Sequence, residues 1–207
     1  MRWLVRLQDT TMLSDRTHYE ELHPTKSAPP SRRVAIQTVN IDAVHLALSN
    51  HISYTAKWGS DYVLVDQKLD PTRSPKWQKI PATLELFEKH EYDYVMWMDS
   101  DAIFANCSKS IEPFLQQMEL EGTSWLFSGD TLIVNSGQMI FKNTAAARDI
   151  LKGIDALWFP HWDNQTHGLQ DNAAVAAYIG GARRPIQAEV EAAYQRADVC
   201  YATGNTT

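Results

Sequence analysis

Two carboxylates, Asp99 and Asp101, stand two positions apart directly after an apolar run at residues 92–98. That run is nearly continuous in apolar character, which is typical of a central strand covered on both faces in a mostly parallel sheet. A chain that leaves such a strand reaches the carboxyl edge of the sheet, where ligands bind in open α/β folds. Side chains two apart on an extended backbone project to the same side, so both carboxylates can reach one ion.

Carboxylate oxygens suit the hard cations Mg²⁺ and Mn²⁺, which proteins hold with one or two acidic side chains, water and substrate phosphates. Such an ion implies a diphosphate ligand, because the metal offsets the negative charge that grows on a departing diphosphate. The alternative is that both residues only cap the next turn, as acidic residues after a strand often do. Spacing alone does not separate the two interpretations, since Asp-x-Asp is a common triplet.

Alternating strands and helices are expected to position this pair. Apolar patterns and turn residues predict strands at 34–40, 61–66, 92–98, 125–127 and 132–141, and helices at 42–59, 81–90, 111–118, 145–151 and 171–179. Asp42 is the expected cap of the first helix, and Pro81 suits the first turn of the second. Strands that alternate with helices predict an α/β fold of three layers around a mostly parallel sheet.

Length and composition fit one folded unit. The chain has 207 residues, of which 44% are hydrophobic, enough for a substantial core. Residues 1–31 are polar and end in Ser-Ala-Pro-Pro-Ser, which is typical of an arm or linker. We therefore expect the folded domain to span residues 32–207.

Charge and hydropathy argue against several classes of protein. Lys and Arg total 19 against 25 Asp and Glu, a net charge of -6 that disfavours a nucleic-acid partner. Only two cysteines are present, which excludes a disulfide scaffold. No run approaches the roughly 18 apolar residues of a membrane span, and charge interrupts the opening residues too soon for a signal core. We expect a soluble chain with neither a span nor a signal.

Residues 96–104, Met-Trp-Met-Asp-Ser-Asp-Ala-Ile-Phe, closely resemble the signature of the galactosyl- and xylosyltransferases of glycosyltransferase family 34. Further blocks resemble that family in the same order, at residues 76–80, 135–137, 141–143, 154–158 and 171–174. Ordered blocks arise by chance much less often than one motif. The resemblance covers roughly residues 32–180 and implies a Rossmann-like GT-A fold, a UDP-sugar donor, and Mn²⁺ or Mg²⁺.

The resemblance assigns roles around the metal and the nucleotide. Asp99 and Asp101 correspond to metal ligands, and Ser100 would lie near the ribose or sugar of the donor. Thr38 and Asn40 lie at the end of the first strand, where GT-A enzymes receive the nucleotide. Ordinary hydrogen bonding at a strand end is the alternative for these last two residues.

Further roles concern the sugar pocket. Lys79 can offset diphosphate charge as a flexible cation, unless it is a solvated lysine at a helix start. Asn135 and Gly137 resemble the loop that shapes the sugar pocket, with a strand-entry turn as the alternative. Asp171 matches an acidic residue beneath the reacting sugar, or serves only as an N-cap. Asn172 replaces the usual Gln of the family and is one methylene shorter.

The sequence departs from the family near its end. The family normally supplies a further metal-binding His from a His-Phe-x-Gly-Cys segment, which does not occur before Thr207. The resemblance therefore indicates a chain truncated at its C-terminal side, with the third ligand unassigned. His161 and His167 are candidates to replace it, although surface histidines are the simpler interpretation. Trp158 and Trp162 can stack on a sugar or pack in the core.

The sequence thus predicts a metal-dependent glycosyltransferase that moves a hexose or pentose from a UDP-sugar to a glycan acceptor with retention of the anomeric configuration. The resemblance implies the lumen of the Golgi or secretory pathway. One alternative is a non-catalytic domain that binds nucleotide sugars or carbohydrates, which the missing His segment favours. The other is a nucleotidyltransferase, although the glycine-rich phosphate loop normal for that class is missing near the first strand.

Overall fold

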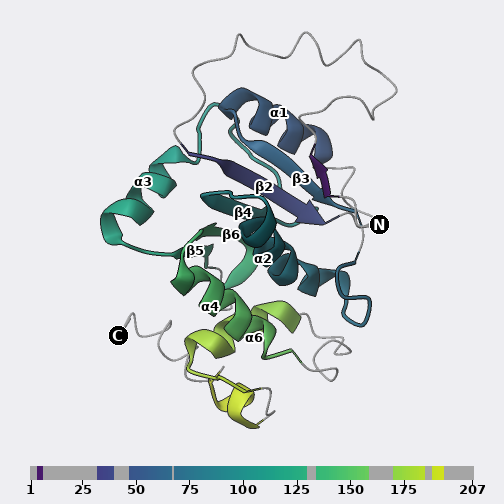
Figure 1. The fold of residues 1–207 in the computed structure, drawn as a ribbon, viewed down its shortest axis with the longest axis vertical. Helices are drawn as coiled ribbons and strands as arrows, with labels where there is room; N and C mark the ends of the chain where they lie inside the picture. The colour runs from purple at the N-terminus through teal and green to yellow at the C-terminus, as the bar shows by residue number, and fades with distance from the viewer. Residues whose placement is uncertain are drawn as a thin grey trace.

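A twisted sheet with helices on both faces forms the centre of the molecule (Figure 1). The computed structural model describes residues 4–6, 32–39, 47–66, 68–129, 134–158, 170–184 and 188–193. The strands are β1 (Leu4–Arg6), β2 (Val34–Val39), β3 (Asp61–Val65), β4 (Tyr94–Met98), β5 (Trp125–Ser128) and β6 (Asn135–Lys142). The helices are α1 (Leu48–Trp58), the short 3-10 helix η5 (Pro75–Gln78), α2 (Lys79–Lys89), α3 (Glu112–Glu121), α4 (Ala145–Asp155) and α6 (Gln170–Ile179).

The sheet is mixed, in the order β1-β3-β2-β4-β6-β5. Only its centre is parallel, where β2 pairs with both β3 and β4. The pairs β1 with β3, β4 with β6, and β5 with β6 are antiparallel. A mostly parallel sheet was the expectation, and it holds only for β3, β2 and β4. The connection from Ser128 to Asn135 is too short for the crossover that a parallel pair needs, so β5 and β6 run antiparallel.

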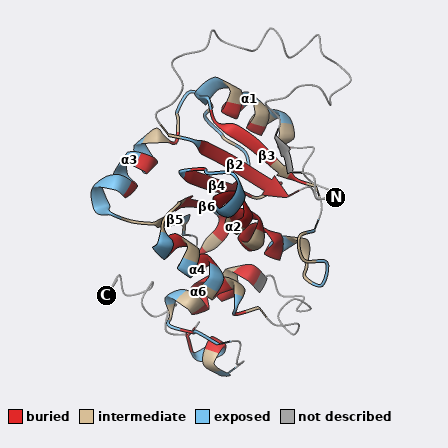
Figure 2. Cartoon of the chain, in the orientation of Figure 1, coloured by how far each residue is buried: buried red, intermediate tan, exposed pale blue. Residues whose placement is uncertain are grey.

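Helices cover both faces and give the three predicted layers, with α1 and α3 on one side and α2, α4 and α6 on the other (Figure 1). Strand β4 shows why, because its side chains alternate between the faces. Tyr94, Met96 and Met98 join the core cluster under α1 and α3. Val95 and Trp97 join the clusters on the side of α2. All five residues of β4 are buried, as expected of a central strand (Figure 2).

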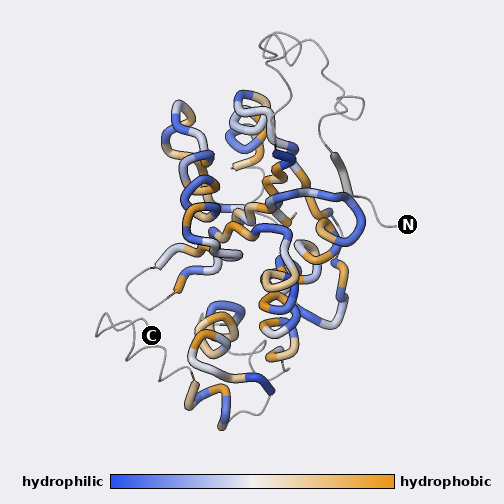
Figure 3. Tube along the Cα trace, turned by 60° about the vertical axis from the view of Figure 1, so that its left-hand side comes forward, coloured by the Kyte–Doolittle hydropathy of each residue, from blue (hydrophilic) through white to orange (hydrophobic). Residues whose placement is uncertain are grey.

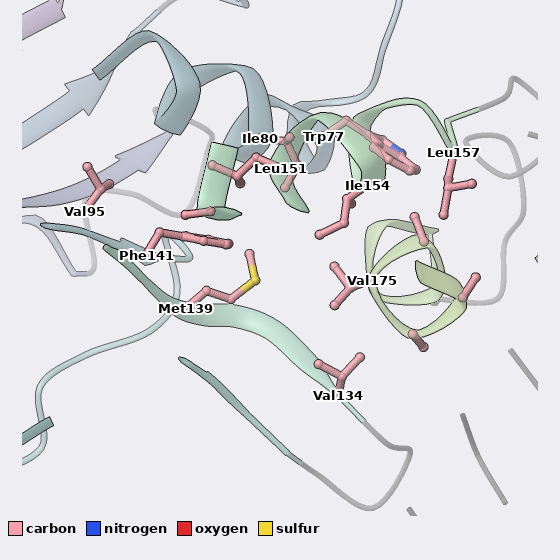
Figure 4. Packing of buried hydrophobic residues seen from close by; sticks show 14 of the residues in the cluster. Trp77, Ile80, Val95, Val134, Met139, Phe141, Leu151, Ile154, Leu157 and Val175 are labelled. Atoms are coloured by element: carbon pink, nitrogen blue, oxygen red, sulfur yellow. The ribbon is translucent and has the colours of Figure 1, made fainter. Parts of the chain in front are cut away.

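The larger core lies between the sheet and the α2, α4 and α6 layer. Figure 4 shows Phe141 and Met139 of β6 pointing toward Leu151 and Ile154 of α4, with Val175 of α6 opposite. Helices α2 and α4 each contribute one apolar face, and hydrophilic and hydrophobic positions alternate along their coils in Figure 3. Helix α6 is enclosed more fully, since all of residues 173–177 are buried. This packing fixes the beginnings of α2 and α6 against the start of β6.

The predicted boundaries agree with the structure to within two residues for β2, β3 and β4. Helix α1 ends at Gly59, whose φ of 70° lets its amide N–H close the helix onto the Thr55 carbonyl. Asp42, the expected cap, lies outside the described residues, and the described helix begins at Leu48. Pro81 lies in the first turn of α2 as predicted.

Strand β1 pairs with β3 at the edge of the sheet and comes from the segment expected to be an arm. The domain boundary at residue 32 stays a prediction. None of the helices in the described ranges is long and apolar enough to cross a membrane.

Four chain ends converge at one edge of the sheet. Met98, the last residue of β4, lies opposite Gln138 in the register with β6. The next amide, that of Asp99, donates to the Gly137 carbonyl at 2.8 Å. Lys79 begins α2, and Asp171 lies in the first turn of α6. The fold thus brings the end of β4, the start of β6 and two helix starts to the place where the sequence predicted a site.

Candidate functional site

A buried lysine lies at the centre of this edge. The side chain of Lys79 is only 3% exposed, and its Nζ lies 2.7 Å from Asp171 Oδ2 and 3.1 Å from Asp99 Oδ1. The same Nζ donates to the carbonyl and hydroxyl oxygens of Ser136 at 3.2 and 3.1 Å. Lysines are almost never fully buried unless they are paired. Lys79 is therefore an internal cation with a fixed set of partners, not a solvated lysine at a helix start.

Lys79 and Asp171 form an ion pair in which each side chain favours the charged form of the other. Burial opposes the charged form of Lys79, but the carboxylates of Asp171 and Asp99 outweigh it and raise the pKa of the lysine. Burial likewise favours the protonated form of Asp171, but the ammonium of Lys79 and the hydroxyl of Ser136 outweigh it and lower the pKa of that carboxyl. Lys79 and Asp171 thus keep each other ionised inside the protein.

Ser136 and Asn172 connect β6 to α6 beside this pair. Asn172 Oδ1 accepts a hydrogen bond from the Ser136 amide at 2.7 Å and lies within hydrogen-bond distance of the Ser136 hydroxyl. The hydroxyl also reaches Asp171 Oδ2 at 2.5 Å. The amide oxygen of Asn172 therefore anchors the start of β6. A contact of Asn172 with the reacting sugar stays a prediction.

Asp99 contacts the group around Lys79 through one of its two carboxylate oxygens. Its Oδ1 accepts a hydrogen bond from the indole Nε1 of Trp97 at 2.6 Å and faces Lys79. The backbone of Gly137 lies close to the other oxygen. A Cβ at this glycine would lie 3.0 Å from Asp99 Oδ2 and 2.8 Å from Asn135 Oδ1. Asn135 Oδ1 in turn accepts from the Gly137 amide at 2.8 Å. The close backbone approach expected at Gly137 is present.

The chain turns immediately after Asp99. The amide of Ala102 donates to the Asp99 carbonyl at 3.0 Å, so residues 99–102 form a tight turn in place of the extended backbone that the spacing argument assumed. Ser100 is buried within this turn, whereas the Asp99 side chain is 40% exposed and Asp101 is exposed. Asp101 makes no hydrogen bond or ion pair to any described residue. Joint binding of one ion by Asp99 and Asp101 stays a prediction.

Helix α1 holds the segment that follows the turn. Asn50 makes two hydrogen bonds with the backbone of Phe104, as acceptor from its amide at 2.8 Å and as donor to its carbonyl at 3.1 Å. His51 Nε2 bonds the Ala102 carbonyl at 2.8 Å. Tyr54 stacks on the Phe104 ring, with the ring centroids 3.5 Å apart. Sequence reasoning missed these contacts because they join polar side chains to a loop far away in the chain.

Other predicted site residues have different surroundings. The buried hydroxyl of Thr38 donates to the Met98 carbonyl at 2.5 Å, which is the strand-end hydrogen bond considered as its alternative role. Trp158 packs on the core and carries the Arg73 guanidinium 4.8 Å from its ring centroid. Four further candidates lie outside the described residues: Asn40, His161, Trp162 and His167. Among the residues that are described, no group of three or more His, Cys, Asp or Glu is placed to hold a metal.

Two residues of this cluster, Trp97 and Ser136, were not singled out from the sequence. Both lie inside the blocks that carry the resemblance, within two positions of residues that were chosen. Trp97 was assigned to a buried strand, and nothing in the sequence indicates that its indole N–H points along the strand toward Asp99. Ser136 stands between Asn135 and Gly137, and only its packing against α6 reveals its bonds.

Comparison with known proteins bears on the family resemblance and the fold. Residues 34–126 match the sequence profile of the galactosyl transferase GMA12/MNN10 family, a region that includes Lys79, Asp99 and Asp101. No curated protein matches the sequence. A solved structure with a similar fold is a glycosyltransferase involved in the glycosylation of the major capsid of PBCV-1. The two share 15% identity at a TM-score of 0.57, over 71% of this chain and 76% of that one. The predicted resemblance and the GT-A-like α/β fold are confirmed.

We expect the buried ion pair to dominate the effect of mutations here. Lys79→Met leaves Asp171 charged and unpaired, so the free energy of unfolding should fall by about 3–5 kcal/mol. The double variant with Asp171→Asn should recover part of that loss. Lys142→Met, which removes the lysine of a partly exposed ion pair with Glu119, should cost much less, because water screens that pair. Equilibrium denaturation of the four proteins measures this, and equal losses for the two lysines would contradict it.

His51 should make the protein less stable in mild acid. Burial lowers the pKa of His51, and its hydrogen bond to Ala102 offsets only part of this effect. The imidazole of His51 binds a proton near pH 6.5 in the unfolded chain but only at lower pH in the folded protein. The free energy of unfolding should therefore fall as the pH drops below about 6.5 toward the folded pKa. His51→Gln should flatten this part of the profile of unfolding free energy against pH. His90→Gln, at an exposed position, is the control, and identical profiles for wild type and His51→Gln would contradict the prediction.

Proposed function

From the match of residues 34–126 to the galactosyl transferase GMA12/MNN10 family, we propose that the protein is a metal-dependent glycosyltransferase. It moves a hexose or pentose from a UDP-sugar to a glycan acceptor with retention of the anomeric configuration. The proposal includes Mn²⁺, or Mg²⁺ in its place, as the metal that Asp99 and Asp101 would hold. The family resemblance further implies work in the lumen of the Golgi or secretory pathway.

The state of the two carboxylates supports this proposal most directly. Asp99 Oδ2 has no hydrogen-bond partner among the described residues, and Asp101 is exposed and unpartnered. Both stand at the end of the central strand, and both supply the oxygen ligands that Mn²⁺ and Mg²⁺ prefer. These residues fit a cation that takes its remaining ligands from water and from the diphosphate of the donor. When bound, such an ion offsets the charge that develops on the departing diphosphate.

The surrounding residues have supporting tasks. Gly137 keeps the space beside Asp99 free of a side chain, and Asn135 holds the Gly137 amide in place. Lys79 is too deeply buried to meet the diphosphate as a flexible cation, so we propose that it acts through Asp99. Ser100 is buried within the turn, and we include its contact with the ribose or sugar of the donor as part of the proposal.

Asp171 bears on how the configuration is retained. Its Oδ2 is occupied by Lys79 and Ser136, and the side chain is only 9% exposed, which makes it a poor nucleophile toward a sugar carbon. We therefore favour attack by the acceptor hydroxyl from the side of the departing diphosphate. The bond from the acceptor oxygen to the anomeric carbon forms, the bond from that carbon to the phosphate oxygen breaks, and the departing phosphate takes the proton. In this proposal Asp171 lies beneath the sugar as the partner of Lys79 and not as a nucleophile.

Replacing Asp101 tests the metal role without disturbing the core. Asp101→Asn removes one negative ligand from an exposed, unpartnered position, so transfer should fall about a hundredfold or more while the circular dichroism stays unchanged. Release of UDP from UDP-galactose, UDP-xylose and UDP-glucose in the presence of Mn²⁺ measures turnover. Asp149→Asn, an exposed aspartate on α4, is the control.

Two results would contradict the proposal. The first is transfer by the wild type that a chelator does not diminish, which would remove the metal from the reaction. The second is a wild type that binds UDP in the presence of Mn²⁺ but releases no sugar from any donor, which would make the chain a binding domain.

A further inference from the structure

We infer that Trp97 is a positioning residue that, with Lys79, holds Oδ1 of Asp99 from the protein side and leaves Oδ2 for the metal. This inference rests on the function proposed above. It assigns to a core tryptophan a task that its position in a buried strand does not reveal.

The first step concerns the indole donor. Trp97 and Asp99 are two residues apart at the end of β4, and the Trp97 Nε1 lies 2.6 Å from Asp99 Oδ1. Trp97 is 0% exposed and packs with Val39, Val65 and Ala82. The surrounding core therefore fixes where the N–H points. A short hydrogen bond from a neutral donor orients a carboxylate strongly and leaves its negative charge in place.

The second step concerns the lysine. Lys79 Nζ lies 3.1 Å from the same Oδ1 and 5.6 Å from the centroid of the Trp97 ring. A cation at this point would repel an incoming metal ion if its charge were not offset. Asp171, 2.7 Å from Nζ, supplies that offset. The buried pair is neutral as a unit, and the negative charge of Asp99 remains available.

The third step concerns the other oxygen. Both donors bind Oδ1, and no described residue donates to Oδ2. On the β6 side, Oδ2 faces Gly137, where even a Cβ would come within 3.0 Å. The Asp99 side chain is 40% exposed although both of its donors are buried. One oxygen is thus held by the core, and the other is free for a ligand from outside.

Trp77 provides a matched control. It is also 0% exposed, and its Nε1 is buried without a hydrogen-bond partner among the described residues. Trp77→Phe therefore removes the same indole as Trp97→Phe, with a comparable loss of packing but no loss of a donor to Asp99. A difference between the two variants reports the hydrogen bond.

The test is a titration of Mn²⁺ followed by electron paramagnetic resonance, on the full chain with UDP at fixed concentration. Trp97→Phe should weaken Mn²⁺ affinity about tenfold or more, as loss of a hydrogen bond to a metal ligand generally does. Trp77→Phe should bind Mn²⁺ like the wild type. If Trp97→Phe does not fold, benzothienylalanine at position 97 keeps the bicyclic shape and lacks the N–H, and it should show the same loss. In turnover, the Mn²⁺ concentration for half-maximal rate should rise while the rate at saturating Mn²⁺ changes little.

The outcomes separate this inference from the function on which it rests. Wild-type affinity for Mn²⁺ in the Trp97 variants, together with loss of binding in Asp99→Asn, would overturn the inference alone. Equal weakening in Trp97→Phe and Trp77→Phe would also overturn it, because lost packing would then be the cause. A wild type that binds no Mn²⁺ in the presence of UDP would overturn the proposed function and this inference together.

Discussion

Burial of the Lys79 ammonium is the constraint on which the candidate site of this protein depends. Removing an ion from water costs several kcal/mol even after the protein relaxes, so the fold must bring oxygen acceptors to it from every side. They come from three elements: Asp171 from α6, Ser136 from β6 and Asp99 from the end of β4. The lysine itself begins α2. The charge of Lys79 therefore connects the starts of α2 and α6 to the two strands at the candidate site.

Much of the fold was predictable because it follows from local patterns. The apolar run of β4, the glycine that ends α1 at residue 59 and the proline in the first turn of α2 each act on nearby backbone. Strand direction is different. β6 pairs antiparallel with β4 because the chain returns beside it from β5, and nothing within the sequence of β6 encodes which neighbour it will meet. The prediction of three layers was correct, and the mixed sheet was not foreseen.

The site shows the same division between local and distant information. Spacing and resemblance predict a role for Asp99 and Asp101 from a short stretch of sequence, and that role stays a prediction. They did not reveal that the backbone turns between them, because a turn and an extended strand accept the same Asp-Ser-Asp letters. The burial of Lys79 was equally hidden. A lysine at a helix start normally points to water, and only contacts with α6 and β6 make it internal.

The hydrogen bonds from α1 to Ala102 and Phe104 have a thermodynamic consequence. The turn at residues 99–102 is bonded to the sheet through the Asp99 amide, and it is bonded to α1 through Asn50 and His51. A turn fixed at both flanks has few alternative conformations to lose when a ligand arrives. The entropic cost of ordering the turn is met during folding. If the turn binds an ion as proposed, little of the affinity would be lost to rearranging the backbone.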